Sequence, residues 1–244
     1  SNNDKSNISS RIIKIAVISV FLGVFVSLSA ISIGKGLQIA IKDKLYSLSP
    51  DLVISTYENN SRGIASEKIN NFESVSSEIK NAFPVIKFEK IIEKPTLISV
   101  DNSFETVIFR GVNNGYNFRD FNNFIIGSKI KNDITNNEII ISKSLSDKLK
   151  ISVGQILTLY FQVNNNQRIP NVRSFNVSYI YETDFPDYDN NYIIGNLETL
   201  QNVYKWSKND YANIEISIED KSQTSLIEKS ISLLSSIEKN NLST

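Results

Sequence analysis

The sequence contains no cysteine, no histidine and no methionine. Without cysteine the chain has no disulfide, no thiolate metal site and no cysteine nucleophile. Without histidine it lacks the commonest general base and metal ligand, so a Ser-His-Asp triad is excluded. These absences predict a non-catalytic protein with no metal and no cofactor. Because position 1 is not methionine either, we expect the chain to begin inside a longer reading frame or to have been processed.

The chain also has no surplus of either charge, because Lys+Arg and Asp+Glu each number 26. A nucleic-acid-binding protein usually carries a basic surplus that neutralises phosphates, so this class is not favoured. Apolar residues make up 41% of 244 residues, which is enough to build a core. After a membrane segment of about 35 residues, one large domain or two small ones remain.

A long uncharged run lies near the N-terminus, from Ile15 to Ile33. As a helix it spans roughly 28 Å, which is about the hydrocarbon thickness of a bilayer. The run is longer than the core of a cleaved signal peptide, and cleavage after Ala30 would put bulky Leu28 where a small residue is preferred. We therefore predict an uncleaved transmembrane helix over residues 15–34.

Small residues recur every four positions within this run, at Ser19, Gly23 and Ser27. Such a stripe allows a second helix to approach closely, which predicts helix packing in the membrane. The alternative is a lipid-facing helix in which the small residues have no partner.

The helical pattern continues beyond the membrane segment. Apolar residues follow at spacings of four and three, at Ile33, Leu37, Ile41, Leu45 and Leu48. This spacing places them on one helical face. The residue before Pro50 avoids the α conformation, so the helix should end there. We predict a stalk helix over residues 35–50 that carries motion between the bilayer and the following domain.

Residues 51–244 mix the two periodicities, which indicates an α+β domain. We expect strands over 51–56, 85–100, 105–112, 138–142, 155–161, 173–181, 192–195 and 213–218. We expect helices over 66–82, 143–149, 197–206 and 222–236. The first strand–helix–strand unit and the last strand–helix unit pack together in this prediction. The middle, 113–210, would then form a second, inserted lobe.

A loop over residues 163–175 is the candidate partner-binding site. Its residues Arg168, Ile169, Pro170 and Arg173 combine two guanidinium groups with a turn stiffened by proline. Arginine offers a rigid fork of donors to a partner's carboxylates or carbonyls, and proline lowers the entropy lost on docking. The alternative is an ordinary exposed hairpin with solubilising charge.

Two other patterns bear on metal and nucleotide binding. Asp184, Asp187 and Asp189 alternate as calcium ligands can, but the glycine and distal glutamate of an EF-hand loop are missing, so a solvated turn is favoured. No phosphate-binding loop is present, because Gly34-Lys35 lacks the second glycine of that motif. ATP should therefore bind on another chain.

Three segments, at 11–55, 137–159 and 179–206, resemble the lipoprotein-releasing (Lol-type) ABC transporter permeases of the MacB/FtsX-like superfamily. The first contains the Gly-x-x-x-x-Ile-x-x-Lys pattern at Gly36, Ile41 and Lys44. The second resembles the family's strand–helix–strand segment, with Gln155 in place of the usual acidic residue. The third resembles the form found in Bacteroidetes-like members.

This resemblance implies an α+β fold in which a transmembrane helix extends as a stalk into a two-lobed MacB-like periplasmic domain. The implied division is a cytoplasmic segment 1–14, membrane helix 15–34, stalk 35–50, porter-like lobe 51–112 with 211–244, and inserted β-rich lobe 113–210. The complete subunit would have four membrane helices, so this chain would be cut before the second. The loop at 163–175 resembles the family's hook, although it is shorter.

The resemblance also implies a function and partners. The chain would belong to a permease in the bacterial inner membrane, with its large domain in the periplasm. A second permease subunit, identical or distinct, and two cytoplasmic ATPase subunits would complete the complex. It would extract lipoproteins and release them to a periplasmic carrier. Alternatively, related permeases export other substrates or activate cell-wall hydrolases. A third hypothesis, a membrane-anchored carboxylate hydrolase, rests only on the Asp184–Asp189 cluster.

Overall fold

The computed structural model describes most of the chain, with short gaps. The described residues are 2–46, 48, 50–56, 67–69, 72–83, 87–100, 103–116, 118, 121–162, 169–218, 223–234 and 242–243. They form two compact units, residues 1–49 and residues 50–244.

The first unit is a single helix, α1 (Asn2–Tyr46). It runs without interruption through the predicted membrane segment and into the predicted stalk, since it contains no proline. Its stretch Ile12–Lys42 is long and apolar enough to cross a membrane, with a mean hydropathy of 2.4. Its large apolar side chains from Ile12 to Ile41 are exposed within the chain, as a lipid-facing helix requires.

The second unit contains a closed ring of six strands. The ring runs in the order β2 (Lys87–Val100), β3 (Ser103–Val112), β8 (Tyr192–Asn196), β5 (Glu138–Ser142), β7 (Asn171–Tyr181) and β6 (Ile156–Phe161). β6 then pairs with the second half of β2 and closes the ring. The β3–β8 and β5–β7 pairs are parallel, and the other four are antiparallel. Closure leaves these strands without an open edge along the paired residues.

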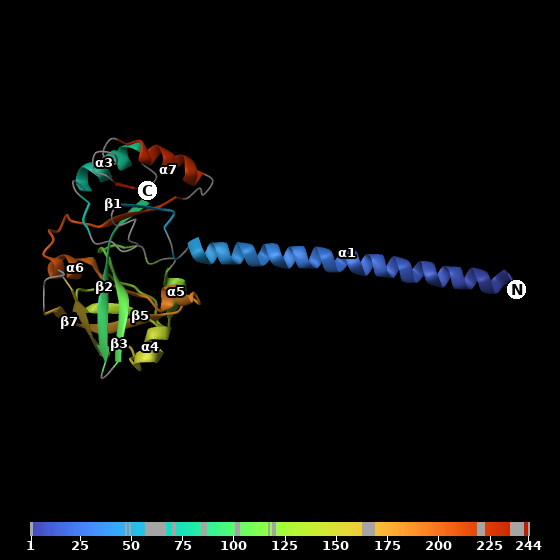
Figure 1. Ribbon diagram of the computed structural model, residues 1–244, viewed down its shortest axis with the longest axis horizontal. Helices are drawn as coiled ribbons and strands as arrows, with labels where there is room; N and C mark the ends of the chain where they lie inside the picture. The colour runs from blue at the N-terminus through green and yellow to red at the C-terminus, as the bar shows by residue number, and fades with distance from the viewer. Residues whose placement is uncertain are drawn as a thin grey trace. The chain divides into compact units, whose positions relative to one another are not determined.

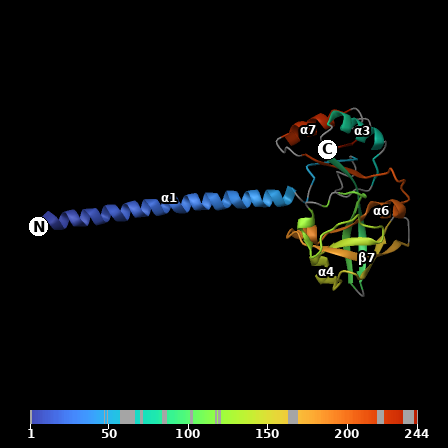
Figure 2. The same cartoon turned by 180° about the vertical axis from the view of Figure 1, so that it is seen from behind.

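A smaller sheet continues from the first half of β2. There β2 pairs with β9 (Asn213–Ser217), which pairs with β1 (Leu52–Thr56), which pairs with β10 (Leu242–Ser243). Helices α3 (Phe72–Ala82) and α7 (Thr224–Ser232) lie side by side over this sheet (Figures 1 and 2). Their buried residues Val75, Ile79, Ile227 and Ile231 join the same core as the strands.

The interior of the barrel is filled with aromatic rings. Phe109 lies 5.7 Å from Phe161 and 5.6 Å from Phe175, centroid to centroid, and all three are buried. Gly195 on β8 faces this cluster, and a Cβ atom there would lie 2.3 Å from the ring of Phe109. The glycine is therefore required for the ring to fit.

Shorter elements complete the unit. They are η1 (Phe121–Asn123), β4 (Ile125–Ile126), α4 (Lys143–Leu149), α5 (Pro186–Asp189) and α6 (Leu197–Tyr204). The side chains of Ser142 and Asn196 cap α4 and α6 by accepting from the backbone N–H of Leu145 and Glu198. Each cap lets a helix begin directly after a barrel strand.

The α+β fold with an N-terminal apolar helix and a β-rich domain is confirmed. The predicted helix over 66–82 is wrong at its start, because α3 begins at Phe72 and Ser66 lies outside the described residues. The backbone N–H of Ile69 instead donates to the carbonyl of Tyr211 at 2.8 Å. The boundary between two lobes at residue 112 stays a prediction, since β2 and β3 pair with strands of both predicted lobes.

Candidate partner-binding site

The predicted binding loop joins the antiparallel strands β6 and β7. The hairpin is in register from Ile156 opposite Asn176 to Phe161 opposite Asn171. Arg168 and the rest of 163–168 lie outside the described residues. On the returning side, Ile169 is 76% exposed and Pro170 is exposed. An exposed isoleucine beside a proline is an apolar contact point whose backbone loses little entropy on binding.

Val172 and Arg173 follow on β7, where adjacent side chains point to opposite faces of the strand. Val172 is 43% exposed, and the Arg173 guanidinium donates to the carbonyl of Val172 at 2.9 Å. Val172 pairs with Tyr160, which pairs with Leu97, so a row of apolar side chains crosses three strands on the outside of the barrel. We call Ile169, Pro170, Val172 and Arg173 the hairpin tip surface.

The predicted stripe on α1 is also fully exposed within the chain. The hydroxyls of Ser19 and Ser27 donate to the carbonyls of Ile15 and Gly23, each at 2.8 Å. A Cβ atom built on Gly23 meets nothing within 4 Å. Since both hydroxyls are satisfied within the helix, the stripe offers a smooth surface to a second helix, and its packing role stays a prediction.

The acidic cluster is not a uniform solvated turn, because Asp189 is buried. Its carboxylate accepts from the backbone N–H of Thr183 at 3.1 Å and from the Thr183 hydroxyl at 2.7 Å. Asp184 and Asp187 are exposed on the same turn. The carboxylate of Asp189 thus fixes the turn before α5. Among the described residues, no three or more acidic side chains are grouped as metal ligands would be.

Sequence reasoning missed a buried charge network between the barrel and the smaller sheet. Arg110 donates to Glu93 at 2.7 Å and to Glu215 at 2.5 Å, so β2, β3 and β9 each contribute one residue. Burial alone would lower the pKa of Arg110, but Glu215, Tyr116 and Glu93 outweigh this and raise it. A signal existed in β3, because Arg110 interrupts the apolar run from Val107 to Val112.

Lys94, next to Glu93 on β2, is another buried charged residue that sequence reasoning did not single out. Its ammonium lies 4.8 Å from the ring centroids of both Tyr204 and Trp206, and the residue is only 4% exposed. Burial lowers the pKa of Lys94 to about 8, while the carboxylate of Glu67 acts in the opposite direction. This cation–π contact attaches the end of α6 to β2.

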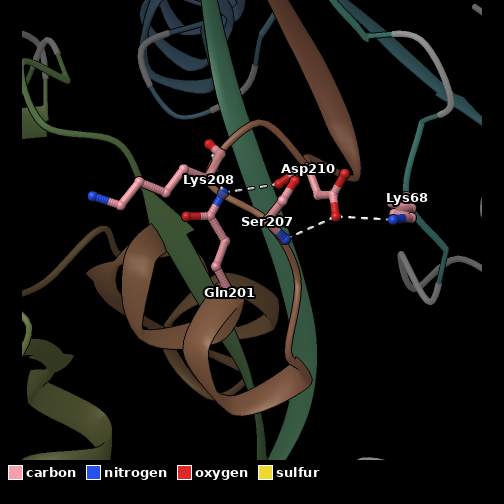
Figure 3. A network of polar contacts seen from close by, with 5 residues as sticks. All are labelled: Lys68, Gln201, Ser207, Lys208 and Asp210. Atoms are coloured by element: carbon pink, nitrogen blue, oxygen red, sulfur yellow. Dashed lines mark hydrogen bonds and ion pairs between the residues drawn. The ribbon is translucent and has the colours of Figure 1, made fainter.

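A polar network also joins the segment after α6 to the chain before α3 (Figure 3). The carboxylate of Asp210 accepts from Lys68 and from the backbone N–H of Ser207, each at 2.9 Å. Burial alone would raise the pKa of Asp210, but these hydrogen bonds lower it. The side-chain amide of Gln201 donates to the carbonyls of Lys208 and Asp210 at 3.1 and 3.0 Å. The polar contacts described above are thus internal and structural. The hairpin tip surface is exposed, and its binding role stays a prediction.

Comparison with known proteins agrees with this architecture. The family model described as "MacB-like periplasmic core domain" matches residues 15–234. The extracellular domain of the noncanonic ABC-type transporter YknZ from Gram-positive bacteria is 16% identical, with a TM-score of 0.50, and the match covers 78% of this chain and 96% of that one. The periplasmic region of MacB from Actinobacillus actinomycetemcomitans is 17% identical, with a TM-score of 0.51, covering 78% and 85%. No curated protein sequence matches the chain.

Proposed function

Because this chain belongs to the MacB-like periplasmic core domain family, we propose that it serves a permease which extracts lipoproteins from the inner membrane and releases them to a periplasmic carrier. The family is that of MacB/FtsX-like ABC transporter permeases, which are generally non-catalytic and work with ATPase partners. Its members are membrane proteins with a periplasmic domain. The lipoprotein substrate and the periplasmic carrier are the parts that we propose beyond the family assignment.

The observation that carries this proposal is the hairpin tip surface. A carrier that receives a lipoprotein needs a docking point that is exposed, partly apolar and held by a rigid element. Ile169 and Val172 supply the apolar contact, and Arg173 extends it with charge. In this proposal Arg168 adds a second guanidinium at the same end of the hairpin.

The proposed mechanism places the energy source outside this chain. Two ATPase subunits on the cytoplasmic side close on binding ATP, and the paired permease subunits transmit this movement through α1. An unbroken helix of 45 residues is about 68 Å long, enough to cross a bilayer and continue beyond it. Ser19, Gly23 and Ser27 are the proposed contact with a neighbouring membrane helix.

The test is lipoprotein release from proteoliposomes that contain the complete permease and its ATPase. We expect ATP and a purified carrier together to release lipoprotein into solution. Arg168→Ala combined with Arg173→Ala should slow release and weaken carrier binding without changing the thermal midpoint. The control, Lys129→Ala combined with Lys131→Ala, also removes two cations but lies away from the hairpin.

The unbroken α1 helix equally supports mechanical signalling to a cell-wall hydrolase. This second function predicts that ATP changes the activity of a hydrolase bound to the domain, with no release of lipoprotein. Carrier binding unaffected by the double arginine substitution would remove the docking role. Absence of ATP-dependent release in the reconstituted complex would reject lipoprotein transport itself.

A further inference from the structure

A small polar pocket lies away from the hairpin tip surface, at the start of α6. Its volume is about 220 Å³, and its walls include Lys90, Asn113, Glu198, Gln201 and Lys208. At roughly 30 Å³ per water molecule, this space holds about seven waters or a molecule of similar size. The pocket is built by β2, the end of β3, α6 and the segment that follows α6.

Two amide oxygens in this pocket lack hydrogen-bond donors among the described residues. The Oδ1 atom of Asn113 is buried without a partner, while its Nδ2 donates to the carbonyl of Asn114 at 3.0 Å. Gln201 is only 4% exposed, and its Nε2 donates to two backbone carbonyls. Only the nitrogen of a side-chain amide can donate to a carbonyl, so these bonds fix which end of each amide is oxygen.

The orientation of Gln201 is visible in Figure 3. Its amide nitrogen faces the carbonyls of Lys208 and Asp210, and its oxygen points to the side toward which the Lys208 side chain extends. The oxygen of Asn113 is a buried acceptor without a donor, which costs free energy comparable to a lost hydrogen bond. Together with the Gln201 oxygen, it would favour a ligand with N–H donors here.

The charges around these oxygens are of both signs. Glu198 is half-buried, and its Oε2 accepts from Asn136 at 3.2 Å. Lys208 is exposed at the rim, and the ammonium of Lys90 lies 4.7 Å from the ring centroid of Tyr211. Acceptors and a carboxylate suit a cation with donors, whereas two ammonium groups suit an anion.

We propose that this pocket binds a small zwitterion that carries a primary ammonium and an anionic group. The three N–H bonds of the ammonium match the three acceptors on Asn113, Gln201 and Glu198. The anionic group, a carboxylate or a phosphate, pairs with Lys90 and Lys208. Free aminoalkyl phosphates, free amino acids and the ethanolamine headgroup of a phospholipid share this chemistry.

Titration calorimetry of the full chain in maltoside micelles tests the proposal with O-phosphoethanolamine as the probe. Phosphocholine is the matched control ligand, because it keeps both charges but has no N–H donors. We expect phosphocholine to bind about tenfold more weakly, as the loss of hydrogen bonds to charged groups predicts. Equal affinity for both ligands would overturn the proposal. So would the absence of binding by O-phosphoethanolamine, glycine and dihexanoyl phosphatidylethanolamine alike.

Single substitutions test which residues bind the ammonium and which bind the anionic group of the ligand. Glu198→Gln and Lys208→Gln should each weaken O-phosphoethanolamine binding about fivefold or more, since each removes one charge partner. Lys229→Gln on α7 removes an equally exposed cation elsewhere and should leave binding unchanged. Thermal melts of each variant separate loss of binding from loss of folding. If both pocket variants keep full affinity while folded, the pocket is not the binding site.

The source of the ligand is decided by a second pair of probes. Tighter binding of dihexanoyl phosphatidylethanolamine than of O-phosphoethanolamine assigns the pocket to a lipid headgroup. Tighter binding of O-phosphoethanolamine or glycine than of the short-chain lipid assigns it to a free zwitterion. The proposal concerns residues outside the hairpin, so its failure would leave the transport proposal untouched.

Discussion

Helix α1 and the six-stranded barrel use the same apolar residue types for opposite purposes. In α1, Phe25 is 60% exposed, and the backbone groups between the two helix ends bond within the helix. In the barrel, Phe109 is fully buried and the backbone bonds run between strands of a closed ring. Both satisfy the backbone without water, but one presents its apolar side chains outward to lipid and the other inward. The tolerance for charge and for side-chain volume should therefore differ between the two regions.

The largest effect is expected from removing the charge at the centre of the buried network. Arg110→Ala leaves Glu93 and Glu215 buried without a cation and should lower the free energy of unfolding by about 3–5 kcal/mol. Urea titration in maltoside micelles, followed by the fluorescence of Trp206, measures this change. Arg173→Ala, on the exposed hairpin, should change it by less than about 0.5 kcal/mol. Similar values for both variants would contradict the proposed importance of this network.

Adding a charge should cost more free energy in α1 than on the outside of the barrel. Val24→Lys places an ammonium in the middle of α1 and should cost about 2.5–3.5 kcal/mol in membrane insertion. A glycosylation-site insertion assay in microsomes measures this cost. Val172→Lys places the same charge on the outer surface of the barrel, where it should leave stability nearly unchanged. Unimpaired insertion of Val24→Lys would argue against α1 as a membrane span.

Added side-chain volume, in contrast, should be destabilising only in the barrel. Gly195→Ala brings a methyl group against the ring of Phe109 and should destabilise the chain by about 1–3 kcal/mol. Gly36→Ala in α1 meets no atom within 4 Å and should be neutral or slightly stabilising. Phe109→Leu should recover part of the loss caused by Gly195→Ala, which a double-mutant cycle in urea would reveal. Additive effects would show that the two side chains do not compete for space.

The smallest effect is a pH dependence from Lys94. Its pKa of about 8 in the folded chain lies below the value of 10.5 expected when unfolded, so between these values the unfolded chain binds more protons. Stability from this group therefore rises with pH, by about 1 kcal/mol between pH 7 and pH 9. Lys94→Met should remove this rise when urea midpoints are compared at the two pH values. An unchanged slope would show that Lys94 titrates normally.

Local sequence was sufficient for many elements of the fold. The strand at Glu138–Ser142 and the helix at Lys143–Leu149 have the predicted bounds, because the change from alternating to helical periodicity coincides with the Ser142 cap. Between α4 and β6 the chain turns at Val153 and Gly154, with Gly154 at a φ of 87°. For the binding loop, sequence identified exposed Ile169 and Arg173, while Arg168 lies outside the described residues.

Sequence by itself therefore determined that a long apolar helix precedes the domain, and it located eight of the ten strands in the described residues, all but β4 and β10. Only tertiary structure decided that β6 returns to β2 and closes a ring, and that Glu93, Arg110 and Glu215 meet. It also decided that Asp189 is buried and that Asn113 and Gln201 line a pocket at α6. The physical reason is that periodicity fixes which face of a strand is apolar, whereas its neighbours are chosen by long-range packing of the whole domain.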